Sequence, residues 1–132
     1  MVPYALKAGE GRTIRYGIDF TIKAGELDPG RGGAVTEYTT RKGEEPPDHT
    51  HPTEDEIFYV LAGDLTFRCG GEAFDVGTGG FMYLPRGLKH GYSIRSEGDV
   101  RLLVISIPTR EGSGEGWGGF VADMERDGEL IN

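Results

Sequence analysis

The chain has 132 residues, which is the length of one domain. Its net charge of −8 argues against nucleic acid as a partner, because phosphate backbones repel an acidic protein. No apolar stretch approaches the roughly 20 residues that span a bilayer, and we expect no signal peptide. The only cysteine, Cys69, cannot form an internal disulfide, so we expect a cytoplasmic protein.

Short strands joined by tight turns are the elements that this composition favours. Glycine contributes 23 residues, spread between apolar runs, which is typical of an all-β sandwich or barrel. We expect residues 1–11 to form an arm or a first edge strand. Residues 12–22 alternate apolar and polar side chains and predict one strand, and the β-branched stretch 34–41 predicts the next. Three prolines exclude a regular helix from 42–52.

The middle of the chain predicts hairpins. Residues 56–76 hold two turn patterns, an Ala-Gly-Asp turn at 62–64 and a Gly-Gly pair at 70–71 that suits a two-residue hairpin loop. Residues 77–94 predict a strand, a proline turn and a second strand. Residues 100–108 are almost continuously apolar and predict a buried strand.

The C-terminal residues 109–132 differ in composition from the rest. Three glycines at 114–119 fit a GxGxxG pattern, but too little chain follows for a dinucleotide-binding unit, so we expect a glycine-rich loop. Phe120 and Met124 lie one helical turn apart and predict at most one short helix or a tail. No linker or repeat divides the sequence, so we expect a single domain over 1–132 with its core at about 12–108.

The three histidines of the chain are concentrated on two of these segments. His49 and His51 are two residues apart, so on an extended chain both imidazoles point to one side. His90 follows the proline turn, and all three rings can converge if the strands around 49–60 and 83–94 face each other. Imidazole binds zinc, copper, iron and nickel, and a nearby carboxylate adds a preference for manganese. A metal site is one interpretation, and an ordinary surface or core role for each histidine is the other.

Two spaced motifs make the chain similar to the cupin superfamily. The first has the order Gly, five residues, His-x-His, four residues, Glu, six residues and Gly, and it consists here of Gly43, His49, His51, Glu56 and Gly63. The second has the order Gly, five residues, Pro-x-Gly, two residues and His, and it consists of Gly79, Pro85, Gly87 and His90. Its last position, Asn in the family pattern, is Ile94 in this chain.

The resemblance implies an all-β, jelly-roll-like barrel with one divalent transition metal (Fe, Mn, Ni, Zn or Cu) in its mouth. Carried over by position, the ligands are His49, His51, Glu56 and His90. Such a set leaves coordination positions open, as in catalytic sites. Glu56 is also the candidate catalytic group, because it could loosen from the metal and take a proton. We expect Glu54 and Asp55, its neighbours in the sequence, to be solvated.

Strand alternation predicts which aromatic side chains share a face with these ligands. Residues two positions after a ligand lie on its face, so Phe58 and Tyr92 should line the pocket. Tyr38 and Phe67 are further candidates, and an ordinary core position is the alternative for each. We expect these four aromatic residues to contact the substrate.

The sequence around the motifs resembles small bacterial quercetin-dioxygenase-like proteins. This resemblance implies a metal-dependent enzyme that inserts dioxygen into a small cyclic or enolic molecule. A non-oxidative isomerase, cyclase or lyase is one alternative, in which the metal only polarises a carbonyl. A binding or sensing module is another, in which the metal anchors a ligand without turnover. Edge strands near 1–22 could pair two copies into a homodimer.

Overall fold

The structure is a computed structural model that describes residues 3–25, 33–108 and 120–132. These residues form ten strands and one helix, α1 (Phe120–Asp127). The strands are β1 (Arg12–Tyr16), β2 (Ile18–Ala24), β3 (Ala34–Thr40), β4 (Glu54–Ala62), β5 (Leu65–Cys69), β6 (Glu72–Val76), β7 (Phe81–Leu84), β8 (His90–Ile94), β9 (Val100–Pro108) and β10 (Glu129–Leu130).

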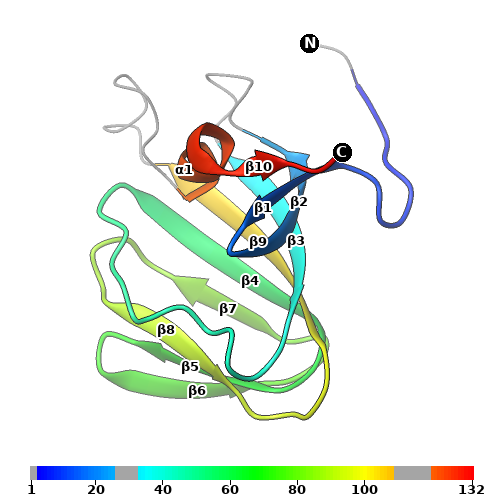
Figure 1. Ribbon diagram of the computed structural model, residues 1–132. Helices are drawn as coiled ribbons and strands as arrows, with labels where there is room; N and C mark the ends of the chain where they lie inside the picture. Colours follow the sequence, from blue (N-terminus) through cyan, green and yellow to red (C-terminus); the bar gives the residue numbers. More distant parts are fainter. Residues whose placement is uncertain (1–2, 26–32, 109–119) are drawn as a thin grey trace.

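The strands form two antiparallel sheets that share one core (Figure 1). The larger sheet has the order β10-β1-β2-β3-β9-β4-β7, and the smaller sheet has the order β6-β5-β8. Phe58 on β4 packs against Phe67 on β5 across the interior, with ring centroids 5.3 Å apart. The expected all-β, jelly-roll-like barrel with one short C-terminal helix is therefore confirmed over the described residues.

The paired strands β4 and β9 have one buried and one outward face. Along β4, Glu54, Glu56, Phe58 and Val60 are buried, and the side chains between them are more exposed. The strand predicted at 100–108 is β9, but its burial alternates in the same way, so it is buried on one face and not nearly throughout. An antiparallel sheet leaves one face outside the core even where the residues on that face are apolar.

The single strand predicted at 12–22 is instead the β1–β2 hairpin. Gly17 forms its turn with a φ of +83°, a conformation that glycine adopts without steric cost. The apolar alternation continues without a break through the turn, because Ile14 and Phe20 are paired across it and are both buried. The pattern therefore did not indicate the turn. Residues 3–11 form no strand, and β10, which no sequence pattern predicted, pairs with β1.

The two turns predicted within 56–76 have different roles. Gly70 (φ +59°) and Gly71 (φ +86°) close the β5–β6 hairpin, as expected for a two-residue loop. The turn at 62–64 joins β4 to β5, which lie in different sheets, so the prediction of a hairpin there is wrong. This turn carries the chain from the larger to the smaller sheet.

The helix α1 covers part of the interior next to β1 and β2. Its residues Val121 and Met124 are buried, and the Phe120 ring lies 5.1 Å from the Phe20 ring. The Gly128 N–H donates to the Met124 carbonyl at 2.8 Å just after the last helical residue. Within the described ranges, no helix is long and apolar enough to cross a bilayer.

Candidate metal centre

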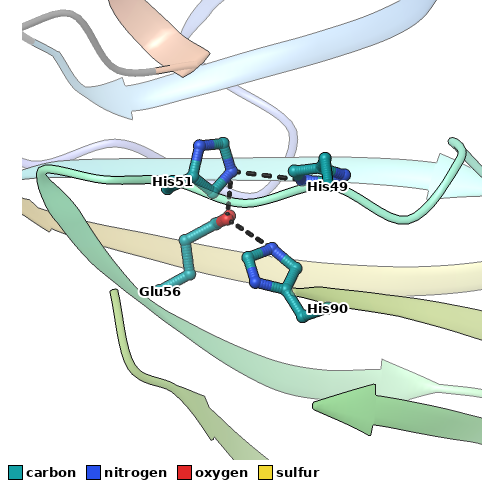
Figure 2. Close-up of side chains that lie close together, drawn as sticks. All are labelled: His49, His51, Glu56 and His90. Carbon is teal, nitrogen blue, oxygen red and sulfur yellow. Dashed lines mark hydrogen bonds and ion pairs between the residues drawn. The ribbon is translucent and has the colours of Figure 1, made fainter. Parts of the chain in front are cut away.

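Four polar side chains from three segments meet in the interior (Figure 2). His49 and His51 come from the proline-rich loop between β3 and β4, Glu56 comes from β4, and His90 begins β8. One nitrogen or carboxylate oxygen of each residue lies within 4.8 Å of the others. The structure thus brings together the four predicted residues, and their role as metal ligands stays a prediction.

Main-chain hydrogen bonds hold the histidine loop against the rest of the fold. His49 and His90 exchange two backbone bonds, of 2.9 and 2.8 Å, which form an isolated antiparallel bridge. The Gly87 N–H donates to the His51 carbonyl at 2.9 Å. These contacts hold the main chain at both loop histidines, and thus the points from which their imidazoles extend.

The candidate ligand atoms have a spacing that fits one ion. His51 Nε2 lies 3.1 Å from His49 Nε2 and 2.6 Å from Glu56 Oε1, and His90 Nε2 lies 3.3 Å from the same carboxylate oxygen. Bonds from zinc to nitrogen or oxygen are about 2.0–2.2 Å long, so ligand atoms around such an ion are separated by roughly 3–4 Å. Two of the three separations lie in this range, and the pair His51–Glu56 is closer.

Unsatisfied polar atoms in the cluster support this fit. Among the described residues, Glu56 Oε1 and both ring nitrogens of His90 are buried without a hydrogen bond. The approach of His51 Nε2 to Glu56 is short but does not have hydrogen-bond geometry. A buried polar atom left unpaired costs about 1–3 kcal/mol. A cation would satisfy Glu56 Oε1 and His90 Nε2 together.

Hydrogen bonding holds His49 in the tautomer that a metal requires. Its Nδ1 lies 2.9 Å from the Pro47 carbonyl oxygen, which can only accept. The Nδ1–H therefore donates, and Nε2 keeps its lone pair for a ligand. On His51, Nδ1 lies 3.5 Å from the Glu54 carboxylate, which favours the same orientation.

The Glu56 carboxylate sets the charge of the cluster. Burial alone would raise the pKa of Glu56, but the adjacent His51 and His90 rings outweigh burial and lower it to about 2. For His51, burial lowers the pKa and Glu56 raises it, with a net upward shift. Glu56 is therefore ionised at neutral pH, which is the state that binds a cation.

The cluster opens into a cavity of about 300 Å³ with a mostly apolar wall. Tyr38, Phe58 and Tyr92 line this cavity, and the two tyrosine hydroxyls share a buried hydrogen bond of 3.0 Å. Their contact with a substrate stays a prediction. Phe67 does not line the cavity: its side chain is fully buried behind Phe58 and Tyr92. Alternation identifies an inward face, but it does not separate the cavity wall from the core behind it.

The expectation that Glu54 is solvated is wrong, whereas Asp55 is half-buried on the outer face of β4. Glu54 is 2% exposed, and its carboxylate accepts a hydrogen bond of 3.3 Å from the Phe120 N–H at the start of α1. Asp55 accepts from the Tyr83 hydroxyl at 2.6 Å and from the Arg86 N–H at 2.8 Å. One feature of the sequence indicated that Glu54 is buried: it lies two residues before Glu56 and therefore shares its inward face.

Asp48, which the sequence analysis did not identify, positions the residue that follows it, His49. The Asp48 carboxylate accepts bonds of 2.7 and 3.2 Å from Arg68 on β5, and this ion pair lowers the pKa of Asp48. Asp48 also packs on Gly91 of β8, where a Cβ atom would lie 2.0 Å from Asp48 Oδ1. Gly91, which follows His90, thus leaves space for Asp48, which precedes His49.

The variant Gly91→Ala is expected to weaken metal binding about 10-fold, the lower end of the range for residues that support metal ligands. The added methyl group would displace the Asp48 carboxylate and disturb the ion pair that anchors the loop. Calorimetric titration of the metal-free protein measures the effect. In an Asp48→Ala background the second substitution should have little effect, because the clash is gone. An equal effect in both backgrounds would show that Gly91 does not act through Asp48.

Sequence comparison finds relatives of this chain. The profile of the cupin domain family matches residues 36–106, more than half of the chain. Quercetin 2,3-dioxygenase of Bacillus subtilis (strain 168) is 29% identical over 96 residues, which are 72% of this chain and 28% of that protein. The chain therefore spans little more than a quarter of that relative.

Solved structures show the same fold. The cupin domain of Schizosaccharomyces pombe Cnp3 superposes with a TM-score of 0.69 at 20% identity, covering 90% of this chain and 83% of that one. A predicted oxalate decarboxylase from Thermotoga maritima also reaches 0.69, at 16% identity, covering 80% of this chain and 99% of that one. Such low identities establish a common architecture and not a common reaction.

Proposed function

The chain belongs to the cupin family, and on this premise we propose that it is a metal-dependent enzyme for a small cyclic or enolic substrate, with dioxygenase chemistry of the quercetinase type. The convergence of three imidazoles and one carboxylate beside an apolar cavity carries this proposal. The similarity to a quercetin 2,3-dioxygenase supports the choice of reaction.

The metal would be held by His49, His51, Glu56 and His90. This donor set suits several divalent transition ions, so iron, manganese, nickel, zinc and copper are all candidates. A bound ion would supply Lewis acidity at its open coordination positions, and a redox-active one would also supply dioxygen chemistry.

Three features of the chain itself would act on the substrate. Glu56 is ionised, so it can accept a hydrogen bond from an enolic hydroxyl that reaches the cluster. Burial raises the pKa of Tyr92 to about 12 and that of Tyr38 well above its ordinary value, so both hydroxyls stay protonated. The hydroxyl that accepts in their shared hydrogen bond keeps its own proton to donate to a substrate oxygen. The apolar wall, which includes Phe58 and Val104, would exclude water from a reactive intermediate.

The volume of the cavity favours a small substrate. At about 300 Å³ it lies at the lower end of the roughly 300–1,000 Å³ typical of ligand pockets. A single ring that carries an enol, or two adjacent oxygen atoms, matches this volume and could chelate an ion. A tricyclic flavonol would fill it more completely and belongs in the test as the larger compound.

Metal content and oxygen consumption test the proposal. The protein is stripped with a chelator, reloaded separately with each of the five ions, and supplied with flavonols and monocyclic enediols in an oxygen electrode. Oxygen uptake coupled to product formation supports a dioxygenase. Product without oxygen uptake would instead indicate an isomerase, cyclase or lyase. Binding without product for every loaded ion would indicate a binding module and overturn the enzymatic proposal.

Removal of the Tyr92 hydroxyl in Tyr92→Phe is expected to lower kcat/KM about 10-fold, equivalent to about 1.4 kcal/mol or one hydrogen bond. Metal content should be unchanged, because the hydroxyl bonds to Tyr38 and not to the cluster. Steady-state kinetics with the compound that is turned over gives the value. Tyr59→Phe, on the outer face of β4, is the matched control. An unchanged kcat/KM for Tyr92→Phe would exclude its hydroxyl from substrate binding.

A further inference from the structure

Glu54 is a buried carboxylate that does not belong to the proposed ligand set. It lies on the inner face of β4, two residues before Glu56, and is 2% exposed. Glutamate is almost never fully buried unless partners compensate its charge. The contacts of Glu54 are therefore informative, and they extend in two directions.

In one direction, Glu54 faces the metal centre. Its Oε1 lies 3.5 Å from Nδ1 of His51, and Nε2 of the same ring lies 2.6 Å from Glu56 Oε1. A carboxylate beside Nδ1 favours the proton on that nitrogen, which leaves the lone pair of Nε2 for a cation. Glu54 thus acts on the orientation of a candidate ligand without being a ligand itself.

In the other direction, Glu54 contacts helix α1. The same Oε1 accepts a hydrogen bond of 3.3 Å from the Phe120 N–H. This N–H belongs to the first turn of the helix, where N–H groups have no acceptor within the helix. The positive end of the helix dipole also favours a negative charge at this place. One carboxylate oxygen therefore connects the start of α1 with the His51 ring.

The start of α1 is also part of the cavity wall. Phe120 and Val121 line the cavity that opens from the metal cluster. The Phe120 ring lies 5.1 Å from Phe20 and 5.8 Å from Tyr16, which line the same cavity from the β1–β2 hairpin. A displacement of α1 would therefore move the cavity wall and the hydrogen bond to Glu54 together.

We propose that Glu54 is a positioning residue that links the docking of α1 to the orientation of His51. The inference rests on the metal ligation proposed above and not on the choice of reaction. Metal binding then stabilises the docked helix, and by thermodynamic reciprocity the docked helix strengthens metal binding. The cavity wall and the metal centre are thus coupled through one side chain.

Zinc titration of the metal-free protein tests this link. Glu54→Leu removes both contacts at similar volume, and its zinc affinity should fall about 10-fold, as for other groups that orient a metal-ligating histidine. Glu54→Gln keeps an oxygen that can accept from His51 and Phe120, so it should restore most of the affinity. Glu37→Leu is the matched control, because it removes a half-buried carboxylate from β3, far from the cluster in the fold, and should leave the affinity unchanged.

A second variant approaches the link from the helix. Phe120→Ala removes the ring that packs on Phe20 and loosens the start of α1. It should weaken zinc binding about 5-fold, the lower end of the range for coupled sites, but have little effect in the Glu54→Leu background. Hydrogen exchange gives a direct measure of the coupling. Zinc should slow exchange at the Val121 and Met124 amides of the unchanged protein, and much less so in Glu54→Leu.

Circular dichroism and urea denaturation of the metal-free variants separate orientation from folding. A Glu54→Leu protein that loses stability but keeps its zinc affinity would show a purely structural role and overturn the inference. Undiminished protection of α1 by zinc in that variant would overturn it equally. If the unchanged protein bound no metal, the ligation itself would fail, and the inference with it. These titrations contain no organic substrate, so their results do not depend on which reaction the protein catalyses.

Discussion

Replacing His51 with alanine is expected to lower metal affinity about 100-fold or more, so that most of the ion is lost on dialysis. His51 Nε2 lies near two other candidate ligand atoms, 3.1 Å from His49 Nε2 and 2.6 Å from Glu56 Oε1. A four-ligand zinc site contributes roughly 10–16 kcal/mol, so one ligand accounts for about 3 kcal/mol. Elemental analysis after dialysis and calorimetric titration measure the loss.

Thr50→Ala provides the matched control, because Thr50 is exposed between the two histidines and lies on the same loop. This control should retain full metal content. Metal should also raise the melting temperature of the unchanged protein and of Thr50→Ala, but not that of His51→Ala, because only a bound ion stabilises the folded state. A folded His51→Ala protein with undiminished metal affinity would refute the ligand assignment.

The convergence of His49, His51, Glu56 and His90 was expected from the resemblance of two spaced motifs to the cupin superfamily, and alternation alone placed only the two loop imidazoles on one side. His49 and His51 are two residues apart, and Glu56 and His90 each occupy an inward position of a strand. Period-two alternation also predicted that Phe58 and Tyr92 face inward. These properties are local, so they can be read from a few residues at a time.

The parts that were missed depend on contacts between distant segments. Nothing near residue 129 indicates that β10 pairs with β1. Gly17 interrupts no apolar pattern, so its turn was not visible. The packing of Asp48 on Gly91 joins a loop to a strand that is far away in the sequence. Alternation predicts that a side chain faces inward, but not how far it lies from the cavity. For this reason Phe67, a fully buried ring, was expected at the cavity wall.

The second large effect that we expect is a loss of stability when this ring, Phe67, is removed. The variant Phe67→Ala is expected to lower the free energy of unfolding by about 3–5 kcal/mol, the usual cost of truncating a buried phenylalanine. The ring is 0% exposed and lies 5.3 Å from Phe58 and 5.7 Å from Tyr92, measured between ring centroids. Urea denaturation of the metal-free protein gives the value without a contribution from metal binding.

Two further variants distinguish a core residue from a substrate contact. Phe67→Leu keeps most of the volume, so it should cost less than Phe67→Ala and leave KM nearly unchanged. Phe74→Ala, on β6 opposite Phe67, should cost on the order of 1 kcal/mol, because that ring is 39% exposed. If Phe67→Ala were instead nearly as stable as the unchanged protein and selectively raised KM, the ring would have to reach the substrate. Phe58 and Tyr92, which now separate it from the cavity, would then have to move apart when the substrate binds.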